Sequence, residues 1–405
     1  MSTNARLFEY IDVNPKEILT KGTLAKKISM DKLQPFCRDI PEYELAEYTG
    51  GTKFRNGDTI MARITPCLEN GKTAMVNILD ENEVGFGSTE YIVFRAKKEL
   101  TIPDFVYYLV RELAIKSMVG SSGRQRVQTN VVENLEIDFP SLTEQTQIAS
   151  VLKSLDDKIA LNNKINNNLE QQAQALFKSW FVEFEPFNGT MPSDWEIVPL
   201  EKIANFQNGY AFKSKALLNE PSPDCYQVFK QGHIARGGGF IPDGTKSWYP
   251  KSIASKLEKF VLKKGDILMA MTDMKDNVAI LGNTAVMPLD NEYIVNQRVG
   301  HLRANGYKGV TYPFIYLLTN STDFLVDLRS RANSGVQVNL SSSEIKASQT
   351  VLPSEEVNNA FSEITLPMFE IIINNQLENQ RLAQLRDTLL PKLMSGELDV
   401  SDIEL

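Results

Sequence analysis

Few residues in this sequence have the types and spacing that catalysis requires. The chain has two histidines, His233 and His301. General-base and metal sites usually need more than these, so histidine-centred catalysis is disfavoured. Asp243, Asp273 and Lys275 have a spacing compatible with the two acids and one lysine that hold a metal in many nucleases, which keeps a metal-dependent nuclease open as an alternative. The sequence contains no Walker A motif and no Asn-Pro-Pro-Tyr box, which excludes the corresponding cofactor sites.

The cysteines and the N-terminus indicate where the chain resides. Cys37, Cys67 and Cys225 are odd in number and show no Cys-x-x-Cys pairing, so neither a disulfide framework nor a zinc site is predicted. Residues 1–10 carry charge in place of an apolar leader, and no stretch approaches the ~20 apolar residues of a membrane span. We expect a cytoplasmic protein without metal, cofactor or membrane contact.

Basic and amide side chains gather in two Gly/Ser-rich stretches, 120–130 and 330–339. Arg and Gln can read base edges, and small flanking residues let a loop enter a groove, so both stretches are predicted to contact DNA. A solvated turn is the alternative for each. The candidates are Arg124, Gln125, Arg126, Gln128 and Asn130 in the first stretch, and Arg331, Gln337 and Asn339 in the second.

Further candidate DNA contacts lie outside these two stretches. They are Arg63, Lys72, Lys230, Gln231, Arg236, Lys275 and Asn277. For each of them an ordinary surface side chain is the alternative. Gly237, Gly238 and Gly239 have the composition of a phosphate cradle, but without a P-loop lysine they are more typical of a hairpin turn.

The elements that position these residues occur twice. Gly57-Asp58 with its flanking residues is repeated at Gly265-Asp266, and five further matches follow in the same order at offsets of 208 to 213 residues. We interpret this pattern as a duplication with a period of half the chain. In each half, apolar runs after the Gly-Asp turn predict strands at 59–64 and 267–271. Helical spacing follows at 105–119 and 313–328.

A long amphipathic helix closes each half. From 143 to 184 apolar or Asn residues recur in steps of four and three, as in a coiled-coil seam, and 357–389 repeats the pattern. The residues predicted for helix pairing or partner docking are Ile148, Leu152, Leu155, Ile159, Asn162, Asn166, Leu169, Leu176 and Trp180, with Phe361, Ile364, Met368, Asn375, Leu382, Leu385 and Leu389. The three Asn residues are expected to fix register, with a solvated kink or contacts to other subunits as the alternative.

These patterns predict an α+β fold. Two globular α/β domains, 1–143 and 186–353, are expected to be related by a pseudo-twofold axis and separated by two long antiparallel coiled-coil helices, 144–185 and 354–405. A helix of this length spans about 60 Å, a fixed spacing that suits a partner with two sites, such as duplex DNA.

The net charge of −8 does not exclude that partner. The two domains carry net charges of −2 and +3, the first helix −2, and the second helix with the tail −7. The acidity is therefore concentrated at the C-terminus, and the domains are close to neutral. We expect most phosphate neutralisation to come from partner proteins.

Three segments carry a resemblance to a known family. They are 195–204 (WEIVPLEKIA) leading into 208–212 (NGYAF), 176–186 at the end of the first helix, and 385–398 at the end of the second. With them, essentially the whole chain resembles the DNA-specificity subunit of type I restriction-modification systems. The first domain departs from the pattern, because 7–15 lacks the Gly-aromatic motif seen at Gly209-Tyr210, so the two domains belong to different subtypes.

The resemblance implies a non-catalytic subunit whose two target-recognition domains read the halves of a bipartite DNA sequence. It also implies that the helices set the spacer and dock two methyltransferase (modification) subunits, alongside two restriction subunits that carry a translocase and nuclease. S-adenosylmethionine, ATP and Mg²⁺ are then expected on those partners only. The metal-dependent nuclease and a structural coiled-coil scaffold with two protein-binding domains remain the alternatives.

Overall fold

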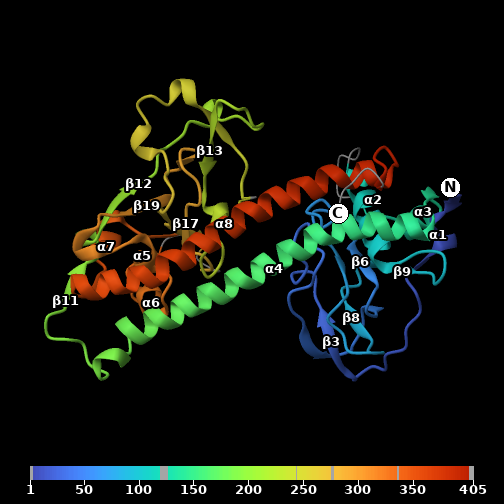
Figure 1. Ribbon diagram of the computed structural model, residues 1–405, viewed down its shortest axis with the longest axis horizontal. Helices are drawn as coiled ribbons and strands as arrows, with labels where there is room; N and C mark the ends of the chain where they lie inside the picture. The colour runs from blue at the N-terminus through green and yellow to red at the C-terminus, as the bar shows by residue number, and fades with distance from the viewer. Residues whose placement is uncertain (1–2, 119–125, 243, 275–277, 335–336, 401–405) are drawn as a thin grey trace. The chain divides into compact units, whose positions relative to one another are not determined.

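The computed structural model describes residues 3–118, 126–242, 244–274, 278–334 and 337–400 (Figure 1). The chain divides into two compact units. Unit 1 comprises Met1–Asn162 and Glu378–Leu405, and unit 2 comprises Asn163–Leu377. Each unit therefore contains one globular domain together with half of each long helix.

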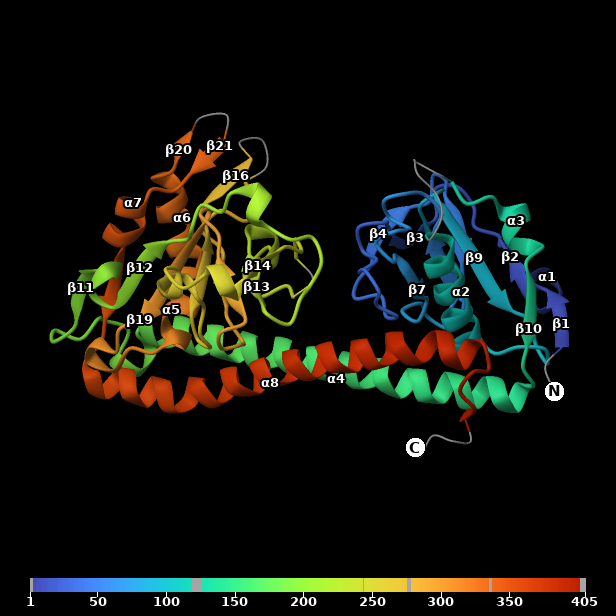
Figure 2. The same ribbon diagram turned by 90° about the horizontal axis from the view of Figure 1, so that it is seen from above.

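In the described part of unit 1, the core contains two four-stranded sheets and a strand pair. One sheet has the order β2-β9-β6-β7 and is antiparallel (Figure 2). The other has the order β4-β3-β8-β5, in which β3 and β8 are parallel. The strands are β1 (Thr3–Arg6), β2 (Ile11–Val13), β3 (Leu24–Ile28), β4 (Glu44–Glu47), β5 (Thr52–Phe54), β6 (Thr59–Ala62), β7 (Thr73–Met75), β8 (Gly85–Gly87), β9 (Tyr91–Ala96) and β10 (Glu136–Phe139), of which β1 and β10 form the pair.

The helices of unit 1 cover its first sheet. They are α1 (Leu7–Tyr10), α2 (Pro103–Met118), α3 (Thr129–Glu133), the N-terminal half of α4 (Leu142–Phe181) and the C-terminal half of α8 (Glu355–Met394). α2 packs against β6, β7 and β9. Its Phe105 shares a core with Leu152 of α4 and Leu390 of α8, so the long helices are part of this unit's interior.

Unit 2 repeats this architecture. Its four-stranded sheet has the order β12-β19-β15-β17, which matches β2-β9-β6-β7 strand for strand, and parallel β13 and β18 match β3 and β8. The predicted duplication is therefore confirmed. The described strands are β11 (Glu196–Pro199), β12 (Ala204–Asn208), β13 (Cys225–Phe229), β14 (Trp248–Pro250), β15 (Ile267–Ala270), β16 (Thr272–Met274), β17 (Thr284–Val286), β18 (Tyr293–Val295), β19 (Val299–Ala304), β20 (Asn333–Ser334), β21 (Gln337–Asn339) and β22 (Gln349–Leu352), and the short helices are α5 (Tyr312–Thr319), α6 (Thr322–Ser330) and α7 (Ser342–Ala347).

The repeated Gly-Asp dipeptide of unit 1 closes a turn and anchors an arginine. Gly57 has a φ of +85°, which favours glycine at the turn before β6. The buried carboxylate of Asp58 accepts the backbone N–H of Arg55 at 2.7 Å. It also accepts two hydrogen bonds from Arg95 of β9, at 2.6 and 2.7 Å. The pair thus joins the turn to the neighbouring strand.

Unit 2 contains the same arrangement with nearly identical geometry. Gly265 also has a φ of +85°, and the Asp266 carboxylate accepts the N–H of Lys263 at 2.7 Å. Arg303 donates two hydrogen bonds to Asp266 at 2.6 and 2.7 Å, and His301 Nε2 lies 2.9 Å from the same carboxylate. The repeated Asp–Arg pair therefore joins the same turn to the same neighbouring strand in both units. We call this pair the Asp–Arg lock.

Replacing Asp266 with Asn should destabilise unit 2 in a pH-dependent way. Burial alone raises the pKa of the Asp266 carboxyl, but hydrogen bonds from Arg303 and His301 outweigh this effect and lower the pKa overall. A lowered folded-state pKa contributes stability above the unfolded pKa of about 4 and loses it as the pH falls through the folded pKa. We expect a loss of about 2–3 kcal/mol at pH 7, less than for a fully buried pair because Arg303 is partly exposed.

The three tryptophans report this change selectively. Trp180, Trp195 and Trp248 all belong to unit 2, so urea unfolding followed by tryptophan fluorescence measures that unit. The difference between wild type and Asp266→Asn should shrink as the pH is lowered below about 4. An equal difference at pH 3 and pH 7 would contradict the prediction.

Side chains define two helix boundaries. Ser141, directly before α4, forms a capping box with Glu144, since each side chain accepts the other's backbone N–H, at 3.3 and 2.8 Å. The helical spacing predicted at 313–328 is divided between two helices, because α5 ends at Thr319 and α6 begins at Thr322. Asn320 ends α5 and donates from its side chain to Thr284 Oγ1 at 2.7 Å, and this contact holds the break.

Within unit 1, α4 and α8 run antiparallel. Asp156 pairs with Arg386, and Lys158 pairs with Glu378. The later residue of α4 thus pairs with the earlier residue of α8. Asn162 lies at the same interface, buried, and donates to Glu378 at 2.7 Å and to Asn379 at 2.9 Å. The seam Asn residue of this unit thus bonds across the helix pair and is not solvated.

Within unit 2 the two helices are also antiparallel. The amide of Asn375 donates to Asn166 Oδ1 at 2.8 Å, and Asn166 is buried. Towards the C-terminus of α4, the Phe177 and Phe181 rings pack edge-on against Phe361 near the start of α8. Here the helix pair merges with an aromatic core that includes the globular domain.

Candidate nucleic-acid interface

In unit 1, two predicted DNA-contact residues meet at one glutamate. Arg63, which follows β6, donates from Nε to Glu90 Oε2 at 3.2 Å, and from Nη2 to the Thr89 carbonyl at 3.2 Å. Arg126 donates from Nη2 to Glu90 Oε1 at 3.0 Å. The backbone also joins the two arginines, because a β-bridge links Ile64 with Arg126. Glu90 therefore holds two guanidinium groups that are 63 positions apart in sequence.

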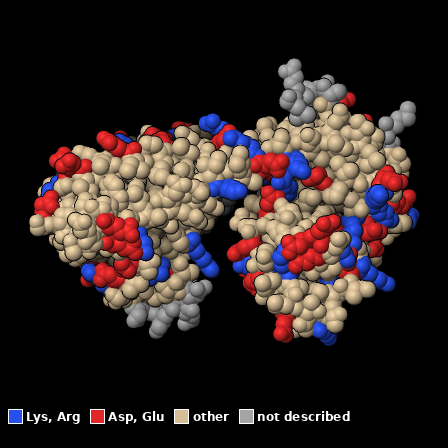
Figure 3. Space-filling view, turned by 60° about the horizontal axis from the view of Figure 1, so that its bottom comes forward, with Lys and Arg blue, Asp and Glu red and all other residues tan. Residues whose placement is uncertain are grey.

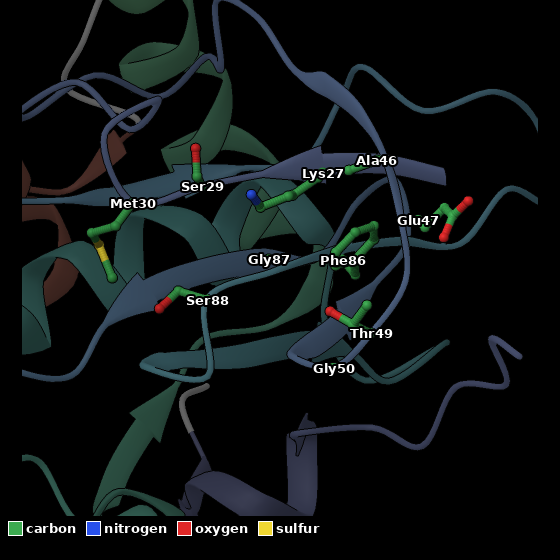
Figure 4. Close-up of a pocket in the computed structure, with 10 residues that line it drawn as sticks. All are labelled: Lys27, Ser29, Met30, Ala46, Glu47, Thr49, Gly50, Phe86, Gly87 and Ser88. Carbon is green, nitrogen blue, oxygen red and sulfur yellow. The ribbon is translucent and has the colours of Figure 1, made fainter. Parts of the chain in front are cut away.

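Lys72 lies beside this cluster. Its Nζ donates to the carbonyl of Met30 at 2.7 Å. Met30 lines a pocket of about 290 Å³ between the ends of β3, β4 and β8 (Figure 4). The pocket lining is Lys27, Ser29, Met30, Ala46, Glu47, Thr49, Gly50, Phe86, Gly87 and Ser88. The Ser88 hydroxyl accepts the Glu90 N–H at 3.1 Å, which links the pocket to the arginine pair.

We define the rim of unit 1 as the residues after β3, β6 and β8, together with the segment that bridges to them: Ser29, Met30, Arg63, Ser88, Glu90 and Arg126. Gln128 and Asn130 continue this segment into α3, and both are exposed. Arg124 and Gln125 lie outside the described residues. The rim thus brings two arginines and a glutamate together beside the Ser88 hydroxyl.

Unit 2 forms a corresponding rim: Lys230, Gln231, Thr272, Asn296, Arg298 and Asn339. The Gln231 side chain donates to the Thr272 carbonyl at 2.7 Å and accepts the Thr272 hydroxyl at 2.9 Å. Asn339 pairs with Thr272 in the β16–β21 ladder and is exposed, as is Gln337. The structure therefore gathers Gln231 and Asn339 at one place. Lys230 adjoins them, while Lys275 and Asn277 lie outside the described residues.

Two other candidates of unit 2 lie apart from these contacts. Arg331 pairs with Asp327 at 2.7 Å, one turn away on α6. Arg236 is exposed in the turn that contains the three glycines, all of which have positive φ. The Ala235 N–H donates to the Gly239 carbonyl at 2.9 Å, and Ile234 bridges to Phe240. This geometry is a hairpin turn, the alternative reading of the glycine run.

The nuclease alternative has no support in the described geometry. Asp273 Oδ2 accepts backbone N–H groups of Ala279, Ile280 and Leu281 at 2.7, 2.7 and 3.1 Å, so it organises a turn. Burial raises the pKa of Asp273, but these hydrogen bonds lower it overall. Asp243 and Lys275 lie outside the described residues. Among the residues with described positions, no group of three His, Cys, Asp or Glu side chains could hold a metal.

The predicted helix-pairing residues fall into three classes of exposure. Ile148, Leu152, Asn162, Asn166 and Phe361 are buried, and Leu155, Ile159, Leu169, Leu176, Trp180, Met368, Asn375, Leu382 and Leu389 are half-buried. Ile364 and Leu385 are 44% and 47% exposed, and Ile371, which lies between them on α8, is 45% exposed. The buried face of α8 instead includes Phe369 and Leu390, because that face also packs on a globular domain.

Sequence reasoning missed two structurally central groups. Glu90 was not a candidate, although it bonds both Arg63 and Arg126. Asp156 and Arg386 form a buried pair at 2.5 Å, and the Asp156 carboxylate also accepts a hydrogen bond from the Tyr108 hydroxyl at 2.8 Å. Glu90 was detectable in principle, because the 208-residue offset aligns it with Arg298, a reversal of charge directly before the equivalent strands β9 and β19.

Basic and acidic side chains are interspersed on the surface of the molecule in Figure 3. On the face shown in Figure 3, Lys and Arg side chains lie beside Asp and Glu side chains, with uncharged surface between the groups. No continuous basic patch covers the described residues on this face. Phosphate attraction on this side would therefore be weak unless another protein supplied charge.

Comparison with known proteins identifies the chain's family. The model of the type I restriction modification DNA specificity domain matches residues 11–171 and 192–386. The chain is 25% identical to the specificity subunit of the type I restriction enzyme HindI from Haemophilus influenzae, over 85% of this chain and 87% of that protein. It is 26% identical to the MjaIX specificity subunit from Methanocaldococcus jannaschii, over 76% of this chain and 71% of that protein.

The fold is also shared with a solved structure. The type I restriction-modification S subunit from M. genitalium superposes with a TM-score of 0.55 at 17% identity, covering 97% of this chain and 96% of that one. None of the described helices combines the length and hydrophobicity that a bilayer crossing requires. With a specificity domain matched in each half, the chain belongs to the DNA-specificity subunits of type I restriction-modification systems.

Proposed function

We propose that this chain supplies sequence recognition and carries no catalytic activity of its own. Each unit reads one half of a bipartite DNA target through its rim. The observation that supports this division is that both units keep the same sheet order and the same Asp–Arg lock, while their rim side chains differ. A repeated scaffold with different exposed polar groups suits two different half-sites.

The partners follow from the same proposal. Two modification subunits dock along α4 and α8, and two restriction subunits complete the complex in the cytoplasm. These partners carry S-adenosylmethionine, ATP and Mg²⁺, and this chain binds none of them. The exposed Ile364, Ile371 and Leu385 are available on α8 for docking. The acidic second helix and tail, at −7, offer charge to a basic partner surface.

Reconstitution tests the proposal directly. The purified chain should neither methylate nor cut DNA, whereas the chain mixed with its modification subunits should methylate adenines at one bipartite sequence. DNA binding by the complex should weaken steeply with salt, because phosphate contacts release counterions. Methylome sequencing of a host carrying the assembled system identifies the target. Methylation by the isolated chain would contradict the proposal.

A further inference from the structure

Three positions of the unit 1 rim are defined by backbone hydrogen bonds. The Arg63 N–H donates to the Glu90 carbonyl at 3.1 Å. The Val127 N–H donates to the Arg63 carbonyl at 2.9 Å, and Arg126 bridges to Ile64. The backbone alone thus places residues 63, 90 and 126 at fixed positions around the end of β6.

The unit 2 rim has the same backbone pattern. The Met271 N–H donates to the Arg298 carbonyl at 3.3 Å, and the Leu340 N–H donates to the Met271 carbonyl at 2.9 Å. Asn339 pairs with Thr272. Met271, Arg298 and Asn339 are therefore the structural equivalents of residues 63, 90 and 126.

The side chains at these equivalent positions differ sharply. Unit 1 has Arg63, Glu90 and Arg126, joined by two ion pairs. Unit 2 has a buried Met271, an exposed Arg298 that forms no ion pair with any residue the structure describes, and an exposed Asn339. Both sets carry one net positive charge, so they attract phosphate similarly. What distinguishes them is the arrangement of hydrogen-bond donors, which determines which base edges can be read.

The geometry of Glu90 leaves donors available. Each of its two oxygens accepts one hydrogen bond, Oε2 from Arg63 Nε and Oε1 from Arg126 Nη2. A guanidinium has five N–H donors in a rigid plane, so Arg126 keeps donors for a base edge while one edge is held. The Arg126 side chain is 51% exposed, which gives DNA access to it.

We propose that residues 90 and 298 are specificity-determining, each for the half-site read by its own unit. Glu90 acts as a positioning residue that holds Arg63 and Arg126 side by side for base contact, whereas Arg298 contacts the DNA itself. This inference rests on the proposed function and deepens it. It predicts that a change at each position alters one half-site and that the two changes alter different halves.

The experiment uses the complex assembled with its modification subunits. Affinity is measured at fixed salt for duplexes carrying the target, the target with either half replaced, and unrelated sequence. Glu90→Gln should reduce discrimination at one half-site about tenfold, the loss expected for a misplaced bidentate contact. Because it removes a negative charge near phosphates, it should also increase binding to unrelated DNA. Arg298→Ala should reduce discrimination at the other half-site about tenfold.

A second test variant and a matched control accompany these substitutions. Arg126→Ala changes an exposed side chain and should reproduce the half-site defect of Glu90→Gln even if the latter folds poorly. Glu42→Gln removes a carboxylate from a different ion pair of unit 1, with Lys32 at 2.7 Å, and should leave both half-sites unchanged.

The outcomes separate the two proposals. If the wild-type complex discriminates both halves but Glu90→Gln and Arg126→Ala leave both intact, the assignment of residue 90 is overturned while the proposed function stands. Defects of Glu90→Gln and Arg298→Ala in the same half would also overturn the inference. A wild-type complex that discriminates neither half would overturn the proposed function, and the inference with it.

Discussion

Inserting one heptad into both long helices, after Asn162 in α4 and after Leu377 in α8, should lengthen the spacer of the DNA target by about three base pairs. Both helices pass from one unit to the other at these points. Seven residues add about 10.5 Å of helix, and one base pair occupies about 3.4 Å of duplex. Because seven residues are close to two turns, each unit keeps its own helix contacts, and both half-site sequences should stay unchanged. Methylome sequencing of a host carrying the variant complex measures the spacer.

A matched control inserts the heptad into α4 alone. Pairing in both units depends on aligned partners, such as Asn162 with Glu378 in unit 1 and Asn166 with Asn375 in unit 2. One lengthened helix cannot satisfy both sets, so this variant should lose methylation and should not acquire a new spacer. An unchanged spacer in the double insertion would show that helix length does not set the spacing.

Replacing Asp156 with Ala should destabilise unit 1 by about 3–5 kcal/mol. The Asp156 and Arg386 side chains are each 5% exposed and lie 2.5 Å apart. Burial alone lowers the pKa of Arg386, but the charge of Asp156 raises it overall, so Arg386 stays charged. Removal of the carboxylate leaves that charge buried, with Asp387 as its remaining ion-pair partner among the described residues.

The measurement separates the units by their fluorophores. All three tryptophans lie in unit 2, so tryptophan fluorescence should show an unchanged urea transition, while far-ultraviolet circular dichroism should show an earlier loss of helix and sheet. The double variant Asp156→Leu with Arg386→Met removes both charges and should recover much of the stability. Equal shifts in both signals would contradict assignment of the pair to unit 1.

Much of the architecture was predictable because duplication repeats local patterns. The Gly-Asp turn needs a positive φ and an arginine partner, and both requirements appear in the sequence at a constant offset.

The seam of α8 was less predictable. Periodicity reports that a face is apolar, but Phe369 and Leu390 pack on globular cores and Ile364 and Ile371 remain exposed. A helix that contacts two surfaces has a wider buried face than a heptad count assumes.

The candidate interface was predictable in composition more than in arrangement. Arg63 and Arg126 are 63 positions apart in sequence, and the β-bridge between Ile64 and Arg126 brings them to one rim. Glu90 was missed because a search for DNA contacts favours basic and amide side chains. The repeat offset marks position 90 only as a reversal of charge; its role depends on Arg63 and Arg126, two partners that only the fold brings together.

Unit 1 is built from two separate stretches of chain, and this determines which unit is completed first during synthesis. Unit 2 is complete when residue 377 has been made, whereas unit 1 needs Glu378–Leu405. Asp156 must wait for Arg386, which lies 230 residues later in the chain. At about 5–20 residues per second, Asp156 waits roughly 10–50 s for Arg386, and all of unit 2 is synthesised within that time. A ribosome that stops between residues 377 and 386 would therefore release a chain that contains all of unit 2 but lacks the Arg386 partner of Asp156, which leaves its N-terminal portion open to chaperones and proteases.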